Sequence, residues 1–386
     1  MEKISAFSRK QLLPALPPPK RQSGIFHWLK RRLFANPLDG IITIFLLIAL
    51  IYTAIPTLRW LFIDASWIGN DRAACATIIQ GGVQPNGWSG ACWAFVRANM
   101  SSFLYGIYPQ SELWRVHCAL LLVIIVNIPL LIPRARFKVI NAILSFIFVP
   151  IFCYIMLYGG AFGLTSVPTA RWGGLLATLI IAYSSIIVSL PLGTLLALGR
   201  QSKKPIIHFL CVIFIETLRG VPLVAVLFVA NVMLPLFFPQ DLNFDNFLRA
   251  LIAVALFTSV YIAEVIRGGL QAVPKAQYEA AWSLGLHYWQ MISFIIVPQA
   301  FRLVIPGVIN ILIGMFKDTS LIYTINMQDL LGAAQNATLQ PNWISPVTPA
   351  TAYIFAGFIF WLFCFAMSRY AHFIERHLNA SRKLQN

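Results

Sequence analysis

Charged and polar side chains that interrupt or end long apolar segments are the residues of this chain best suited to chemistry. Lys317-Asp318-Thr319-Ser320 ends one such segment and combines both charge signs with two hydroxyl groups. Where an apolar segment spans a membrane, a charge in it costs about 2.5–3.5 kcal/mol on insertion scales, so such charges are usually paired or functional. We predict that Asp318, Thr319 and Ser320 contact a small polar molecule. The alternative is an outer anchor or gate in which Lys317 pairs with Asp318.

A second group of charges occurs in earlier segments. Glu264 and Arg267 are three residues apart, and Glu216 and Arg219 share this spacing. Residues three apart on a helix are neighbours, so each couple favours a local ion pair. Because an ion pair explains Glu264, this residue is a weaker candidate for solute contact than Asp318. Tyr261, on the same segment, is also a weaker candidate.

The sequence lacks the spacings of common enzyme and metal sites. Its six histidines form no HExxH motif, and GxSxG, GxGxxG and GxxxxGK[ST] do not occur. We predict no metal site, no catalytic residues and no enzyme activity. Any ATP-driven work would need a separate ATPase chain.

Two of the six cysteines lie outside the apolar segments. Cys75 and Cys92 belong to a stretch of about fifty residues that contains turn sequences such as Pro85-Asn86-Gly87. If this stretch faces an oxidising exterior, a disulfide between Cys75 and Cys92 is favoured over two free thiols.

The composition places these residues in a membrane protein. Of 386 residues, 59% are hydrophobic and 11% charged, whereas soluble domains carry about 45–50% and about 25%. A helix needs about 20 apolar residues to cross a bilayer. Eight segments approach this length: 40–58, 116–132, 139–158, 173–199, 221–238 (after a shorter apolar stretch at 205–215), 248–267, 294–316 and 347–367. We predict an all-α polytopic membrane protein with about eight transmembrane helices.

Charge between the segments sets their orientation. With the N-terminus inside, the basic clusters at 134–138, 200–204, 267–275 and 369–383 all face the cytoplasm, as the positive-inside rule requires. The outward segments contain instead the acidic residues Asp64, Asp71, Glu112, Asp241 and Asp245. The net charge of +16 is thereby explained without a nucleic-acid partner. The basic arm at 1–38 is predicted to lie in the cytoplasm, beside the lipid bilayer.

One predicted cytoplasmic loop, residues 268–293, contains a recognisable motif. Pro274 favours the start of a short helix and Gly285 its end. Glu279-Ala280-Ala281, Gly285 four residues later, Ile295 and Val297-Pro298 resemble the EAA motif of ABC importer permeases, with Val297 where that family usually has Leu. The resemblance implies that Glu279, Ala280, Ala281 and Gly285 couple the chain to an ATPase subunit.

Three further short segments narrow the family that this sequence resembles. The segments at 216–223 (ETLRGVPL), 261–269 (YIAEVIRGG) and 317–321 (KDTSL) are similar to those of polar amino acid permeases of the histidine/glutamine type. The chain as a whole resembles the larger permease subunit of general L-amino acid importers (Aap/Bzt type). The resemblance implies a type I importer fold with a five-span core after three extra spans. It also implies three partners: a second homologous permease, an ATPase dimer and a periplasmic amino-acid-binding protein. ATP and Mg would be bound by the ATPase, with no cofactor in this chain.

These inferences give a predicted organisation. A cytoplasmic arm (1–38) precedes a three-span extension (39–171) with a periplasmic loop (63–115), a permease core (172–371) and a cytoplasmic tail (372–386). The predicted location is the bacterial inner membrane, with both termini in the cytoplasm. The alternatives are an ABC permease for another small polar solute, or a secondary transporter, which would be expected to show repeated halves with broken helices.

Overall fold

The computed structural model describes residues 24–132, 135–237 and 245–383, and it forms two units. Met1–Ala65 with Ser89–Ala91 make the first unit, and Ser66–Trp88 with Cys92–Asn386 make the second. Part of the predicted arm (1–23), Arg134, Phe238, Asp241 and the end of the tail (384–386) lie outside the described residues.

The first unit contains the first predicted span. α1 (Ile25–Leu33) is followed by α2 (Pro37–Leu58), which a π-helical turn, η2 (Arg59–Ile63), prolongs. Pro37 suits the first helical turn because its missing N–H would have no partner there. The Thr43 hydroxyl donates a hydrogen bond to the Leu33 carbonyl at 2.8 Å and so links α2 to α1. The predicted span at 40–58 is thus a helix, longer at both ends.

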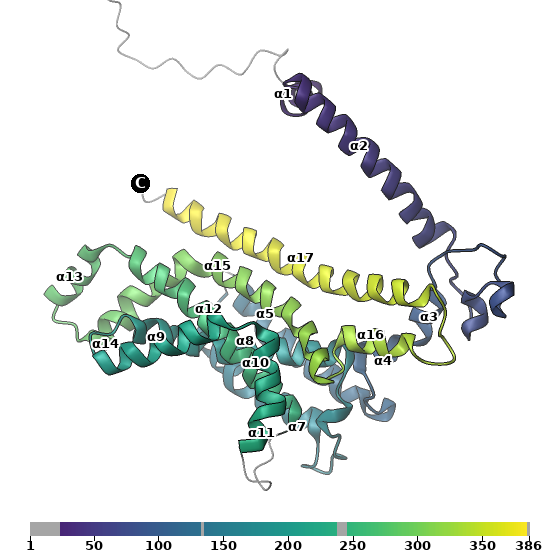
Figure 1. Ribbon diagram of the computed structural model, residues 1–386. Coiled ribbons are helices and arrows are strands. Elements are labelled where there is room, and N and C mark those ends of the chain that lie inside the picture. Colours follow the sequence, from purple (N-terminus) through teal and green to yellow (C-terminus); the bar gives the residue numbers. More distant parts are fainter. Residues whose placement is uncertain (1–23, 133–134, 238–244, 384–386) are drawn as a thin grey trace, which may run out of the picture. The chain divides into compact units, whose positions relative to one another are not determined.

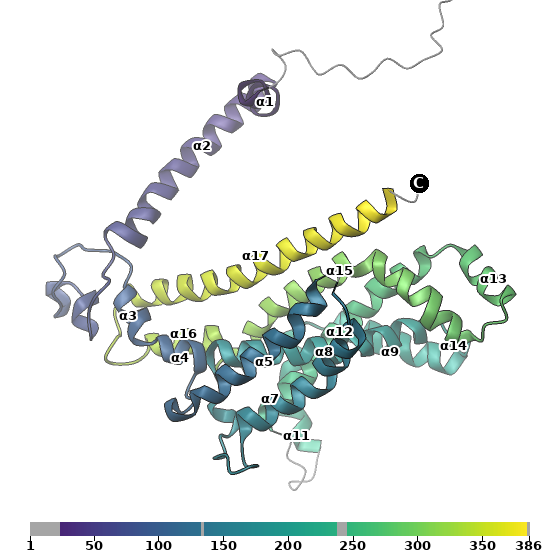
Figure 2. The same ribbon diagram turned by 180° about the vertical axis from the view of Figure 1, so that it is seen from behind.

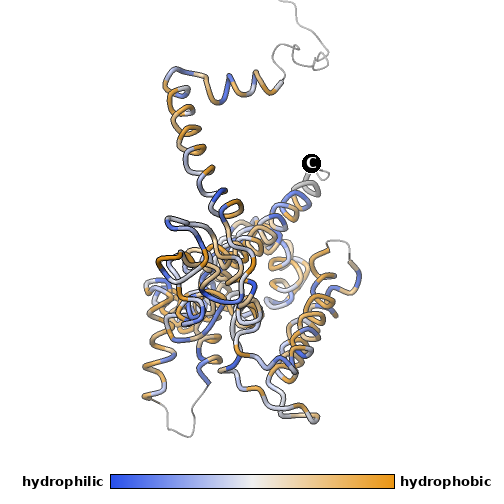
Figure 3. Tube along the Cα trace, turned by 90° about the vertical axis from the view of Figure 1, so that its right-hand side faces the viewer, coloured by the Kyte–Doolittle hydropathy of each residue, from blue (hydrophilic) through white to orange (hydrophobic). Residues whose placement is uncertain are grey.

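The second unit consists of long apolar helices. Its membrane-length segments are α5 (Leu113–Leu131), α6–η6–α7 (Lys138–Ile143, Leu144–Phe148, Val149–Tyr158), α8 (Gly174–Arg200), α12 (Asn246–Ala272), α14–η10–α15–η11 (Tyr288–Gln290, Met291–Ile296, Val297–Asp318, Thr319–Ile325) and α17 (Thr348–Lys383). Figure 3 shows hydrophobic residues along much of their length. With α2, seven described helices are long enough to cross a membrane, or eight if one bent pair counts as a span. The predicted all-α polytopic fold is confirmed.

The bent pair corrects the predicted fifth span. α9 (Pro205–Gly220) continues five residues beyond the predicted apolar stretch at 205–215 and then turns by 107° into the segment Leu223–Phe237, made of α10 (Leu223–Phe228), η8 (Val229–Met233) and α11 (Leu234–Phe237). Figure 1 shows α10 and α11 leading away from α9. The break occurs at Pro222 because proline lacks an amide hydrogen and disfavours helical backbone in the residue before it. The predicted span at 221–238 is therefore one arm of a broken helix.

The centre of the second unit is the packing of α12 against α8. Gly193 of α8 has no room for a side chain, because a Cβ atom there would lie 2.8 Å from the Ser259 carbonyl oxygen of α12. Ala253 and Ala263 of α12 are also fully buried. Small residues let membrane helices approach closely, and the resulting van der Waals contacts hold them together. α12 is thus fixed along its buried face.

The part of the extension that belongs to the second unit is held by polar contacts. The Asn127 amide of α5 donates to the Tyr183 hydroxyl of α8 at 3.1 Å, and Ser145 of η6 lies 2.9 Å from the same hydroxyl. At the other end of α5, the Arg115 guanidinium pairs with Glu112 at 2.9 Å and donates to the Thr165 carbonyl. These partly buried contacts fix α5 and the chain after α7.

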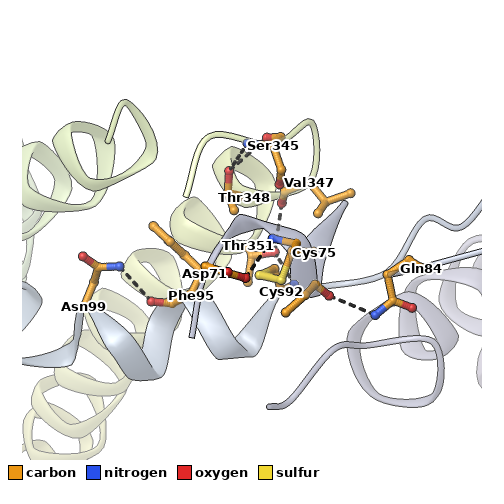
Figure 4. Close-up of a disulfide and its surroundings, with 12 residues drawn as sticks. Asp71, Cys75, Gln84, Cys92, Phe95, Asn99, Ser345, Val347, Thr348 and Thr351 are labelled. Carbon is orange, nitrogen blue, oxygen red and sulfur yellow. Dashed lines mark hydrogen bonds between the residues drawn. A yellow bond between two sulfur atoms is a disulfide. The ribbon is translucent and has the colours of Figure 1, made fainter. Parts of the chain in front are cut away.

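The loop before α5 is folded. Figure 4 shows a disulfide between Cys75 and Cys92, whose Cα atoms are 5.7 Å apart. The Cys92 amide donates to the Thr351 hydroxyl of α17 at 2.9 Å. Phe95 of α3 (Trp93–Ala98) packs with Trp343 in the same apolar cluster. The disulfide therefore closes a structure that packs onto the start of α17.

A buried carboxylate begins α16 (Leu330–Thr338). Asp329 is fully buried, and its Oδ1 accepts a hydrogen bond from the Gly332 amide at 2.8 Å, while no described group pairs with its Oδ2. Burial raises the pKa of Asp329 to about 7, although the backbone hydrogen bonds oppose this shift. The charged form is therefore disfavoured in the folded protein.

We expect this carboxylate to make stability depend on pH. The folded state holds the Asp329 proton more tightly than the unfolded state, so stability should fall as pH rises from about 4 to about 7. Asp329→Asn keeps an acceptor for the Gly332 amide without a charge and should raise the unfolding temperature at pH 8 more than at pH 5. Asp71→Asn, at an exposed cap that accepts from the Ala73 amide, is the control. An equal effect of Asp329→Asn at both pH values would contradict this assignment.

Candidate functional site

A cavity between α12 and α15 contains two of the predicted site residues. Its volume is about 340 Å³. Asp318 lies at the end of α15 and Tyr261 lies on α12, and both line the cavity. The remaining lining residues are Phe257, Thr258, Ile311, Gly314 and Met315. A small apolar cavity with one carboxylate and a few hydroxyl groups is suited to a small molecule that carries a positive charge.

Asp318 is the one acidic residue in the cavity wall. Its side chain is half-buried, and no described residue forms a hydrogen bond or ion pair with it. Lys317, the next residue, is exposed. It forms no salt bridge with Asp318 within 4 Å. The charges of these two residues therefore interact without a direct contact, and the alternative of an outer anchor or gate stays open. A carboxylate that lacks a hydrogen-bonded partner among the described residues, in a membrane-length helix, is a candidate binding group.

The two hydroxyl residues after Asp318 lie elsewhere. Thr319 is fully buried and donates to the Phe316 carbonyl at 2.7 Å, and Ser320 donates to the Lys317 carbonyl at 2.8 Å. Neither residue lines the cavity. The chain turns into η11 after Asp318, so adjacent side chains point in different directions. The structure thus does not bring Thr319 and Ser320 together with Asp318.

Thr258 and Tyr261 supply hydroxyl groups instead. Thr258 is buried in the cavity wall one helical turn from Tyr261, and no described residue bonds to its hydroxyl. The ring of Phe257 lies 5.1 Å from that of Tyr261. Aromatic faces attract cations, so these rings add to the preference for a positively charged group.

Glu264 belongs to an ion cluster next to the cavity. Its carboxylate accepts from Arg200 of α8 at 2.6 Å and from Arg267 at 3.0 Å, and Arg219 of α9 lies 3.5 Å away. Arg200 also pairs with Glu216 of α9 at 2.7 Å. The cluster therefore joins the ends of α8 and α9 to the C-terminal third of α12.

Tyr261 connects the ion cluster to the cavity. The guanidinium carbon of Arg219 lies 6.0 Å from the centre of the Tyr261 ring, within the range of a cation–π contact. Glu264 is absent from the cavity wall. The interpretation of Glu264 and Arg267 as an ion pair fits this geometry, and the pair extends to two further arginines.

The loop with the EAA motif forms a short helix at one end of the second unit, opposite α16 (Figures 1 and 2). α13 (Lys275–Ser283) begins after Pro274, and Gly285 adopts a φ of +71° that favours glycine. Ala281 is 1% exposed and packs on η10, whereas Glu279 and Ala280 are exposed. The helix therefore presents Glu279 and Ala280 outward and holds itself in place through Ala281.

Large apolar side chains are exposed beside this helix. Trp282 is 61% exposed and Leu284 is 76% exposed, outside the membrane-length segments. Exposed apolar side chains of this kind are candidates for contact with a protein or a membrane surface.

Sequence reasoning missed most of the cavity wall. Its α15 residues, Ile311, Gly314, Met315 and Asp318, lie seven, four and three residues before Asp318 and at Asp318 itself, so they share one helix face. Reading backward from Asp318 at this spacing identifies them. The pairing of that face with α12 depends on tertiary packing and has no sequence signal. No described group of His, Cys, Asp and Glu residues is suited to a metal ion.

Known proteins resemble this chain along its full length. Residues 189–380 match the family described as binding-protein-dependent transport system inner membrane component. The inner membrane amino-acid ABC transporter permease protein YhdY of Escherichia coli K12 is 43% identical over 96% of this chain and 97% of its own length. The glutamate/glutamine/aspartate/asparagine transport system permease protein BztC of Rhodobacter capsulatus is 37% identical over 98% of this chain and 99% of its own length.

A solved structure, of an amino acid ABC transporter with histidines, is 28% identical to this chain. The match covers 53% of this chain and 92% of the chain in that structure, with a TM-score of 0.46.

The ion cluster predicts a large difference between two similar substitutions. Glu264→Gln leaves three arginines without their shared carboxylate and should lower the free energy of unfolding by about 3 kcal/mol. Glu216→Gln removes one half-exposed partner of Arg200 and should cost less than about 1 kcal/mol. Unfolding of both purified variants in detergent checks this. Equal losses of stability would show that Glu264 does not hold the cluster together.

Proposed function

Because the chain belongs to the amino-acid permeases of binding-protein-dependent ABC importers, multi-pass proteins of the inner membrane, we propose that it forms half of a translocation path for polar L-amino acids. The full-length similarity to two amino-acid permeases is the observation that carries this proposal. The name of BztC makes small acidic and amide amino acids the first substrates to test.

The other half of the path would come from a second permease subunit. An ATPase dimer would bind ATP and Mg and supply the energy, and a periplasmic binding protein would deliver the amino acid. This chain would be a non-catalytic subunit without a cofactor of its own. Broken helices like the one at Pro222 are also found in secondary transporters. The EAA motif nevertheless favours an ATP-driven importer over a secondary transporter.

The proposed orientation places α13 in the cytoplasm. This assignment is supported by the basic residues at the same ends of the helices, which include Arg200, Lys203 and Arg267. The disulfide-closed loop would then face the periplasm, where oxidation is favoured. We propose that the disulfide between Cys75 and Cys92 holds this loop on α17 and takes no part in transport chemistry.

The ATPase would dock on the exposed side of α13. Glu279 and Ala280 would enter its groove, and Trp282 and Leu284 would bury their apolar surface against it. Ala281 would act inside the permease, because it is buried against η10. Gly285 would contribute the left-handed turn that ends the helix.

The cavity would bind the amino acid during its passage. Asp318 would accept hydrogen bonds from the ammonium group, and the Thr258 and Tyr261 hydroxyls would donate to the carboxylate. Thr319 and Ser320 would support the end of α15 through their bonds to backbone carbonyls. Glu264 would orient Tyr261 through Arg219.

The first test concerns Asp318. Removing one charge-assisted hydrogen bond costs about 1.5–3 kcal/mol, so Asp318→Asn should raise the apparent KM for amino-acid uptake by about tenfold or more in the reconstituted importer. Lys317→Gln, at an exposed neighbouring position outside the cavity, should leave the apparent KM unchanged. If Asp318→Asn lowers only the maximal rate for acidic, neutral and basic amino acids alike, Asp318 gates the path and does not bind the solute.

The second test concerns coupling. Ala280→Trp adds bulk to an exposed helix face, so the permease should still fold. A groove fitted to alanine would be overpacked by about 1–3 kcal/mol, and ATP-driven uptake and co-purification of the ATPase should fall about tenfold or more. Lys203→Trp, an exposed position in the loop between α8 and α9, is the control. Normal uptake by Ala280→Trp would contradict docking on this face.

A further inference from the structure

A large cleft lies between the extension and the permease core, at the end of the helices that carries α13. Its volume is about 920 Å³. Leu131 at the end of α5 and Lys138 at the start of α6 form one side of the cleft, and residues of α15 and α17 form the other. The Tyr370 hydroxyl of α17 donates to the Leu131 carbonyl at 3.1 Å across this junction. The cleft is thus built by contacts between the extension and the core.

Arg302 is an exposed cation in the cleft wall. It lies on α15, and no described residue forms a hydrogen bond or ion pair with its guanidinium group. An arginine in a membrane-length helix is costly unless it reaches a counter-charge. Counting from residue 294, where the apolar run begins, the helix rise places Arg302 about 12 Å into the segment. At this depth the Arg302 backbone lies among the acyl chains, and its long side chain, which leaves the helix toward the N-terminal end, extends toward the lipid headgroups.

The other charges favour an anionic ligand. Lys138 adds a second permanent cation to the lining, and Glu375 is its one carboxylate. The Oε2 atom of Glu375 lies 3.6 Å from Nδ1 of His372, a residue that does not line the cleft. Counting only Lys, Arg, Asp and Glu residues, the formal charge of the lining is therefore +1 (two cations and one anion).

Much of the wall around these charges is apolar. Leu130, Leu303, Ile305 and Ile374 line the cleft beside Arg302. A ligand that places an anionic group at these cations and hydrocarbon chains along the apolar walls is a phospholipid. Basic pockets between transmembrane helices on the cytoplasmic side are suited to such headgroups.

We propose that the cleft binds one anionic phospholipid of the cytoplasmic leaflet, with its phosphate at Arg302 and Lys138 and its acyl chains along α5 and α15. Val273 and Pro274, which connect α12 to the coupling helix α13, line the same cleft. The bound lipid therefore contacts the segment through which α13 is attached.

The test uses the complete importer in detergent, titrated with dioleoylphosphatidylglycerol and followed by native mass spectrometry. We expect one saturable lipid whose affinity falls about fivefold in Arg302→Gln, as the loss of one cation at a membrane surface predicts. Arg302→Lys should retain binding. Arg376→Gln, an exposed charge on α17 outside the cleft, should also retain it. If Arg302→Gln does not assemble, Leu130→Trp narrows the cleft from α5 without changing its charge and should weaken binding similarly.

Three results would overturn the proposal. The first is equal binding of phosphatidylglycerol by wild type and by the Arg302→Gln or Leu130→Trp variant. The second is equal binding of dioleoylphosphatidylcholine, which would show that no anionic headgroup is recognised. The third is loss of a partner subunit from Arg302→Gln without any change in lipid binding, which would identify the cleft as a protein interface.

Discussion

The close approach of α8 and α12 is the constraint on which the rest of the second unit depends. Gly193 has no space for a Cβ atom because the Ser259 carbonyl and the Ile262 side chain lie against it. A hydrophobic effect does not drive helices together inside lipid, so this contact depends on small residues and dense packing. With its buried face fixed on α8, α12 must turn its remaining faces toward α15 and α9.

Those remaining faces carry the cavity and the ion cluster. Thr258 and Tyr261 face the cavity, and Glu264, one turn further along α12, binds the arginines of α8 and α9. The helix then continues to Ala272, about 16 Å beyond Tyr261, and leads through Pro274 into α13. In the proposed function, one continuous helix therefore connects the amino-acid cavity to the surface where the ATPase docks. The two extra spans of the second unit, α5 and α6–η6–α7, lie against the core without interrupting this connection.

Features set by local sequence were predicted well. The apolar runs became helices, and the proline and glycine around Glu279 mark the bounds of α13. Features set by tertiary contacts were not. The i,i+3 spacing indicated a Glu264–Arg267 pair but carried no sign of Arg200, which is 64 residues away in sequence. Likewise, Thr319 follows Asp318 directly, yet the helix turn buries it away from the cavity. The bend at Pro222 had a local signal in the proline itself, but the angle between the two apolar stretches on either side of it had none.

The central claim is that an amino acid passes through the cavity between α12 and α15. An experimental structure of the assembled importer with bound amino acid tests it most directly. The account predicts density in this cavity, with the ammonium nitrogen within hydrogen-bond distance of an Asp318 oxygen. Density for the amino acid elsewhere along the path, with the cavity closed or filled by protein side chains, would contradict the account.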